Sequence, residues 1–165
     1  MATFPISARL AAKTFNLGQT CSFNIATDQT EIPEFRAVFL SSEAVTADGE
    51  ATSDNQTVTL PGGATAIGNA LGVTVFGGDN ALLSTVPSTT LDANVTVALD
   101  KTYILEVAAG EAVVKGSIVE VNAVGQAVAA TTGTATGFLA LEAAAGTGTA
   151  TNPEYIVVLV NQITS

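Results

Sequence analysis

The stretch that decides the fold of this 165-residue chain is residues 102–142, TYILEVAAGEAVVKGSIVEVNAVGQAVAATTGTATGFLALE. Its short apolar runs are interrupted by glycines at positions 110, 116, 125, 133 and 137. Short apolar runs between turn-forming glycines are typical of β-hairpins. The stretch carries no catalytic side-chain pattern, so it predicts an architecture rather than a chemistry.

The same pattern extends outward from this stretch in both directions. Further strands are predicted at Phe35–Leu40, Thr57–Leu60, Ala66–Phe76, Asn94–Leu99 and Tyr155–Val160. The third of these contains two glycines and is expected to bend or bulge. The last is apolar throughout and is expected to be a buried closing strand. About nine to eleven short strands, with turn signals every 8–12 residues, predict an all-β fold: a compact β-barrel or β-sandwich with an extended N-terminal arm.

The first 30 residues differ from the rest of the chain in charge. Arg9 and Lys13 precede the first acidic residue, Asp28, whereas the chain after residue 27 carries three basic and 15 acidic residues. An opposite-signed tail on an acidic body is typical of an arm that reaches another surface. We therefore divide the chain into an N-terminal arm (1–30) and a β-barrel or sandwich domain (31–165). A strand within the same barrel and a disordered tail remain as alternatives for the first segment. The candidates for contact with a neighbouring subunit are Phe4, Arg9, Lys13, Phe15 and Phe23.

Composition narrows the class of protein. Charged residues make up 12% of the chain, about half the usual share, and the net charge is −10. A low-charge surface suits proteins that pack against neighbours, and a negative field with no basic cluster disfavours nucleic-acid binding. The longest strongly apolar run, Tyr155–Val160, is far shorter than the ~20 residues of a membrane span, and no secretory signal is evident. We expect a soluble protein made in the cytoplasm.

Candidate chemical groups are few. The chain has no His, which removes Ser–His and Cys–His nucleophile pairs and imidazole metal sites. The single cysteine, Cys21, is expected to be an ordinary buried thiol. Glu106 and Glu120 are expected to be acids on a solvated sheet face rather than a catalytic pair. The acidic loop that contains Asp48, Glu50 and Asp54 lacks the spacing of a calcium loop. We therefore predict no enzymatic activity, no cofactor and no metal.

Five pieces of the chain occur in a recognisable order. They are Val107–Gly110, Ala112–Gly116, Val119–Val121, Gly125–Ala130 and Gly137–Gly146, and they are followed by Tyr155–Val160. In this order they resemble the core of the small capsid cement proteins, or head-decoration proteins, of tailed bacteriophages. Upstream, Phe35–Val38 and Ala66–Gly68 resemble the family's early segments, so that the resemblance covers roughly residues 35–160.

The resemblance implies a structural protein on the outside of an icosahedral phage head. Such proteins bridge major capsid subunits, often as homotrimers where capsomers meet, and resist the pressure of packaged DNA. It implies the major capsid protein as partner, no nucleic acid and no membrane, and a place on the virion exterior after synthesis in the host cytoplasm. The alternative is a surface-displayed β adhesin or carbohydrate-binding module. Such modules usually present exposed aromatic rings, whereas Tyr103 and Tyr155 lie inside apolar strands.

Overall fold

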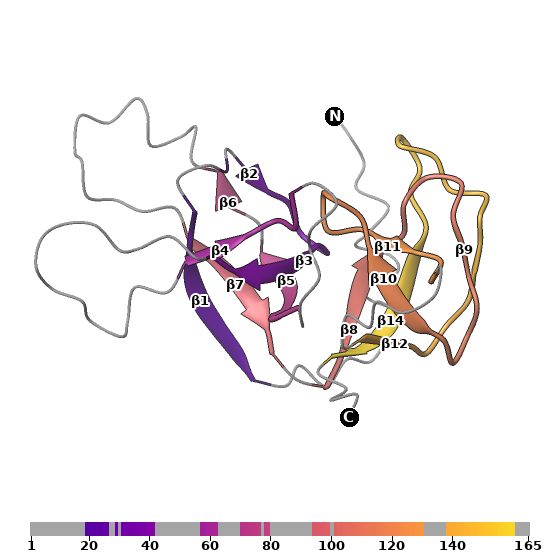
Figure 1. The fold of residues 1–165 in the computed structure, drawn as a ribbon, viewed down its shortest axis with the longest axis horizontal. Helices are drawn as coiled ribbons and strands as arrows, with labels where there is room; N and C mark the ends of the chain where they lie inside the picture. The colour runs from indigo at the N-terminus through magenta and orange to yellow at the C-terminus, as the bar shows by residue number, and fades with distance from the viewer. Residues whose placement is uncertain are drawn as a thin grey trace, which may run out of the picture.

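The computed structural model describes residues 19–26, 29, 31–41, 57–62, 70–76, 78–79, 94–99, 101–130 and 138–160. These residues form fourteen strands, of which nine have three or more residues and five have two. They contain no helix, and so no helix with the length and hydropathy that would cross a membrane. The predicted all-β class is confirmed (Figure 1).

The first half of the described chain forms a closed five-stranded barrel. Its order is β1 (Thr20–Ile25), β4 (Thr57–Thr59), β3 (Ala37–Leu40), β5 (Gly72–Phe76) and β7 (Asn94–Ala98), and β7 returns to β1. The β1–β4 pair is parallel and the other pairs are antiparallel. A small ladder of β2 (Glu31–Ile32) and β6 (Gly78–Asp79) lies beside it. The predicted 66–76 strand, which was expected to bend or bulge, begins at Gly72 as β5 and has a register shift between Thr74 and Phe76; residues 66–69 lie outside the described part.

The second half forms a five-stranded antiparallel sheet that curls on itself. Its order is β11 (Ala127–Val128), β10 (Ile118–Val121), β12 (Phe138–Ala140), β14 (Tyr155–Val160) and β8 (Lys101–Glu106). Val107, directly after β8, forms a bridge to Ala127 of β11, and the next residue, Ala108, donates its N–H to the Ala127 carbonyl at 2.9 Å. The two ends of the sheet therefore meet.

Strand β14, which lies inside the sheet between β12 and β8, corrects one expectation. It pairs with β12 on one side and β8 on the other, but its side chains alternate between half-buried and buried. Ile156, Val158 and Val160 face the core, and the residues between them are partly exposed. The strand is thus buried on one face only, since antiparallel sheets usually cover one face and leave the other solvated.

The glycine spacing marks turns wherever the structure describes it. Gly110, Gly116 and Gly125 all have left-handed φ angles, between 77° and 86°. Gly133 and Gly137 lie outside the described residues. A short ribbon of β9 (Ala112–Val113) and β13 (Ala144–Ala145) extends from the curled sheet.

Strand β1 bears on the interpretation of the first 30 residues. Residues 20–24 of β1 pair with β7, and residues 24 and 25 pair with β4, so this strand belongs to the barrel. The N–H of Leu99 also donates to the Gln19 carbonyl at 2.9 Å. Residues 1–18 lie outside the described part, and an arm role for them stays a prediction.

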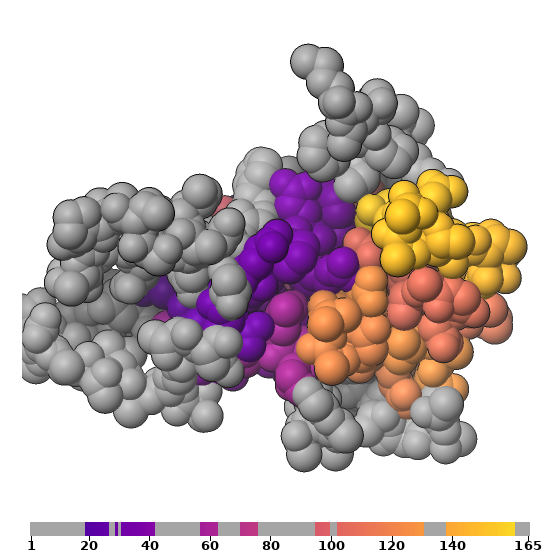
Figure 2. Space-filling view, turned by 90° about the horizontal axis from the view of Figure 1, so that it is seen from above, coloured from indigo at the N-terminus to yellow at the C-terminus, as the bar shows by residue number. Residues whose placement is uncertain are grey.

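The two halves lie side by side and share a core. We call the described residues between 19 and 99 the N-terminal lobe and those between 101 and 160 the C-terminal lobe. Figure 2 shows the indigo and magenta surface of the first lobe in contact with the orange and yellow surface of the second. One hydrophobic cluster contains residues of both lobes, such as Phe35, Val73 and Ala98 from the first, with Tyr103 and Ile156 from the second. A smaller cluster around Ile32, Val58 and Val97 fills the barrel.

Candidate functional site

The seam between the lobes is built around Phe35. Its backbone is left-handed (φ 61°), an uncommon conformation for a bulky residue. The Phe35 N–H donates to the Thr74 carbonyl at 2.9 Å, and its carbonyl accepts from Glu106 N at 3.0 Å. The buried ring stacks on Tyr103 (centroids 6.1 Å apart, 21° between planes) and meets Tyr155 edge-on (5.6 Å, 74°). The predicted strand at Phe35–Leu40 therefore starts two residues later, at Ala37.

Thr74 of β5 explains how this turn is held. Its side chain is fully buried, and its hydroxyl donates to the Pro33 carbonyl at 2.7 Å while accepting from Arg36 N at 3.0 Å. Its own N–H donates to the Arg36 carbonyl at 2.9 Å. One residue thus satisfies the backbone groups on both sides of Phe35. Such a network can maintain a strained φ angle because the surroundings determine it at several points.

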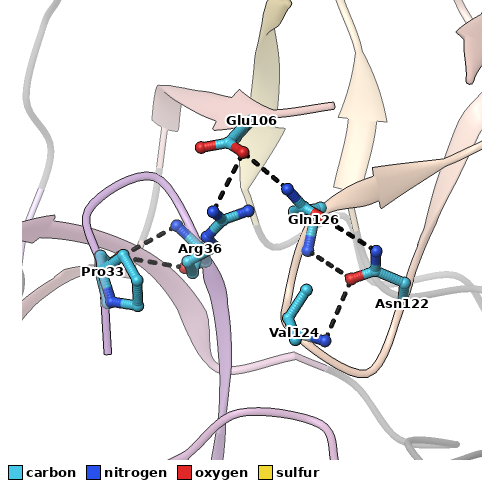
Figure 3. Close-up of polar contacts among 7 residues, drawn as sticks. Pro33, Arg36, Glu106, Asn122, Val124 and Gln126 are labelled. Carbon is cyan, nitrogen blue, oxygen red and sulfur yellow. Dashed lines mark hydrogen bonds and ion pairs between the residues drawn. The ribbon is translucent and has the colours of Figure 1, made fainter. Parts of the chain in front are cut away.

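A polar chain crosses the seam from Arg36 (Figure 3). Arg36 Nη2 lies 3.0 Å from Glu106 Oε1, and both side chains are 13% exposed. Gln126 Nε2 donates to the same Glu106 oxygen at 2.6 Å, and Asn122 Nδ2 donates to Gln126 Oε1 at 2.9 Å. Asn122 Oδ1 in turn accepts from the N–H groups of Val124 (3.1 Å) and Gln126 (3.0 Å). The chain of contacts runs from the barrel to the turn between β10 and β11.

That turn also accepts backbone hydrogen bonds from the N-terminal lobe. The N–H of Ala37 donates to the Gly125 carbonyl at 2.8 Å, and the N–H of Gly62 donates to the Ala123 carbonyl at 3.0 Å. A Cβ atom on Gly125 would lie 2.5 Å from the Ala37 carbonyl oxygen. With a φ of 77° as well, position 125 requires glycine.

The seam has the chemistry of a structural junction. In its polar chain the charged groups, Arg36 and Glu106, neutralise each other, and the remaining members are amides and backbone groups. Over the residues that the structure describes, no group of three or more His, Cys, Asp or Glu side chains is placed to hold a metal ion. Arg36 Nε and Nη1 are buried and have no hydrogen-bond partner within the described part of the chain. The arrangement joins the two lobes through side-chain and backbone contacts.

A second polar feature closes the loop before β14. The Glu154 carboxylate accepts from three successive N–H groups, those of residues 146, 147 and 148, at 3.0, 3.1 and 3.2 Å. It also accepts from the Thr147 hydroxyl at 3.1 Å. Partial burial alone would raise the pKa of Glu154, but the four hydrogen bonds outweigh it and lower the pKa below its ordinary value. Successive N–H groups that converge on an anion form a nest, here filled by the chain's own carboxylate.

The structure places only one of the predicted contact residues. Phe23 lies in β1 and is half-buried against the barrel core. Phe4, Arg9, Lys13 and Phe15 lie outside the described residues, as does the acidic loop at positions 48–54. The contact role of these residues stays a prediction.

Two expectations about single residues were wrong. Cys21 is exposed rather than buried, because it lies in the outer part of β1, whose first residues all face solvent. Glu106 and Glu120 are not on a solvated face, since Glu106 binds Arg36 at the seam and Glu120 is 9% exposed in β10, opposite Val128.

The sequence did not reveal the seam itself. Residues 36, 106, 122 and 126 belong to no common motif, and only the folded chain brings them together. One signal was present: Arg36 is a charged residue inside the apolar run Phe35–Leu40, and a charge in such a run needs a buried partner.

Comparison with protein-family models, with curated proteins and with solved structures found no match for this chain.

Proposed function

We propose that this chain is a structural virion protein that binds the outside of a tailed-phage capsid as cement. The observation that carries the proposal is the place of the resembling sequence pieces in the fold. The pieces between Val107 and Gly146, with Tyr155–Val160, fall together in the C-terminal lobe, where strands β8 to β14 form one curled sheet and its ribbon. A residue pattern that coincides with one structural unit supports a shared architecture.

The surface of this lobe suits broad contact with another protein. Among the described residues between 102 and 160, Lys115 is the only charged residue that is exposed. The other exposed residues described there are uncharged: they are mostly Ala, Gly and Thr, with Asn152 and two larger apolar residues, Val114 (71% exposed) and Val124 (48%). Weakly charged contact areas repeated by capsid symmetry gain strength from multivalency. The partner is the major capsid protein, and the chain acts on the virion exterior as a homotrimer.

The adhesin or carbohydrate-binding alternative has weaker support. Sugar-binding modules present aromatic rings to solvent. The chain has no Trp and two Tyr residues. Tyr103 is 4% exposed, and Tyr155 packs its ring edge against Phe35. Both rings are therefore engaged at the seam.

Binding to capsids of the same phage tests the proposal. Purified protein is added to heads that lack it and is co-sedimented over a range of concentrations. We expect saturation at a fixed copy number per head and a rise in the temperature at which the heads release DNA. A glycan array run in parallel separates the two functions: no saturable capsid binding together with saturable glycan binding would replace cement with the adhesin alternative.

A further inference from the structure

The two lobes have separate hydrogen-bonded sheets. All described strands before residue 100 belong to the N-terminal lobe and all strands after it belong to the C-terminal lobe, so each lobe has its own hydrogen-bonded sheet. Their mutual orientation depends on side-chain packing and on the few hydrogen bonds that cross the seam. A charged pair, Arg36 and Glu106, lies among these contacts with only 13% of each side chain exposed.

Stability alone does not account for a charged pair at this place. Removing two charges from water costs much of what their attraction returns, and an apolar pair of equal volume often stabilises a fold as well or better. Two further nitrogen atoms of Arg36, Nε and Nη1, are buried and unpaired among the described residues, which adds to the cost. Compared with an apolar contact, the pair restricts the relative orientation of the two lobes more strongly, because hydrogen bonds tolerate far less rotation than packed rings do.

The pair is also connected to the backbone contacts of the seam. Glu106 accepts a hydrogen bond from Gln126, and Gln126 accepts one from Asn122. Asn122 in turn accepts hydrogen bonds from two N–H groups of the turn and so stabilises its shape. The carbonyl groups of that turn, at Ala123 and Gly125, are the ones that accept from the barrel. We therefore expect loss of the charge pair to loosen the turn and, with it, two of the backbone hydrogen bonds between the lobes.

We propose that the Arg36–Glu106 pair is an orientation lock, which selects one arrangement of the two lobes and contributes little to the free energy of unfolding. The shared hydrophobic cluster that contains Phe35 provides the apolar contact between the lobes, and the polar chain determines the angle at which they meet. The lock is a property of the isolated chain and does not depend on capsid binding.

The chain offers a direct test through its own cysteine. Cys21 is the single cysteine and is exposed on the N-terminal lobe, and Ala112→Cys adds a second exposed label site on β9 of the C-terminal lobe. Electron–electron dipolar spectroscopy on spin labels at these two sites measures the distance between the lobes. We expect a single narrow distribution for the otherwise unchanged chain. In the double variant Arg36→Met/Glu106→Leu we expect a distribution at least about twofold broader, with an unfolding midpoint that is unchanged or higher.

Two further variants make the outcome decisive. Glu106→Gln keeps the shape of the side chain and removes its charge, so it should also broaden the distribution, and it decides the matter if the double variant does not fold. Lys115→Met removes an exposed charge on the same lobe as the second label and should leave the width unchanged. An unchanged width in the charge-removing variants, whether or not their stability falls, would show that the pair is an ordinary stabilising contact and would overturn the proposal.

Discussion

The backbone N–H of Ala37 donates a 2.8 Å hydrogen bond to the carbonyl oxygen of Gly125. This bond joins the first residue of β3 in the barrel to the turn between β10 and β11. It requires the two backbones to approach so closely that no side chain fits at position 125. The contact between the lobes therefore depends on a glycine that the sequence marks only as one of several turn residues.

Substitution of this glycine should be costly. In Gly125→Ala the new Cβ meets the Ala37 carbonyl oxygen at 2.5 Å while φ stays at 77°. The left-handed angle costs about 1–2 kcal/mol and the overlap about 1–3 kcal/mol more. We expect the free energy of unfolding, measured by chemical denaturation, to fall by about 2–5 kcal/mol.

Gly110→Ala is the matched control for the Gly125 variant. Gly110 has nearly the same angle, 78°, but nothing lies within 4 Å of its hypothetical Cβ. Its substitution should cost only the angular strain, about 1–2 kcal/mol. Equal losses in the two variants would mean that the close approach at the seam contributes nothing.

Tyr103 should make stability depend on pH in the alkaline range. Burial, with a smaller effect from the Glu34 carboxylate, raises the pKa of Tyr103 from 10.0 to about 12. The neutral phenol is favoured in the folded state, so its contribution is complete below pH 10 and is lost as pH rises toward 12. We expect the free energy of unfolding to decline by about 2–3 kcal/mol across this interval. In Tyr103→Phe the decline should be much shallower; an equally steep decline would assign it to other groups.

Glu154 should make stability depend on pH in the acid range, where stability falls as pH falls. Because its pKa is lowered, the contribution of the nest to stability is complete above the ordinary pKa of a glutamate. This contribution is lost as pH falls through the lowered pKa. Glu154→Gln replaces the charged carboxylate that accepts hydrogen bonds from three N–H groups with a neutral amide. We therefore expect faster hydrogen exchange at residues 146–148 at neutral pH. Glu111→Gln serves as the control, since Glu111 accepts only a 3.4 Å bond from Ala129 N and should alter exchange at that residue alone. Unchanged exchange at all three nest amides would contradict the role given to Glu154.

Deletion of the N-terminal segment should separate folding from binding. Because β1 begins at Thr20, removal of residues 1–18 leaves the barrel intact, and we expect an unchanged unfolding midpoint. If the segment is a contact arm, binding to capsids should weaken by about tenfold or more, which is about 1.4 kcal/mol. Removal of residues 1–25 deletes β1 and opens the barrel between β4 and β7, so that variant should lose its fold. Full capsid affinity without residues 1–18 would move the contact site to the body.

The local features of this fold were predictable, because they depend on neighbouring residues. Glycines at regular spacing mark turns, and runs such as Asn94–Ala98 and Tyr155–Val160 formed strands close to their predicted limits. The one-sided burial of β14 was missed because an apolar run does not tell how many faces its sheet covers.

The seam could not be predicted, because it depends on residues that only folding brings together. The left-handed Phe35 lies in a run that alternates like a strand, and it is Thr74 that fixes its conformation from another strand. The Arg36–Glu106 pair likewise joins two lobes with separate sheets. Closure of the barrel through a parallel β1–β4 pair also has no local signal.

Cryo-electron microscopy of virions made from the genome that encodes this chain would test the proposed cement function most directly. We expect density for the described two-lobed fold on the capsid exterior, at symmetry-equivalent positions, in contact with more than one major capsid subunit. Virions whose capsid exterior carries no density that fits this chain would contradict it.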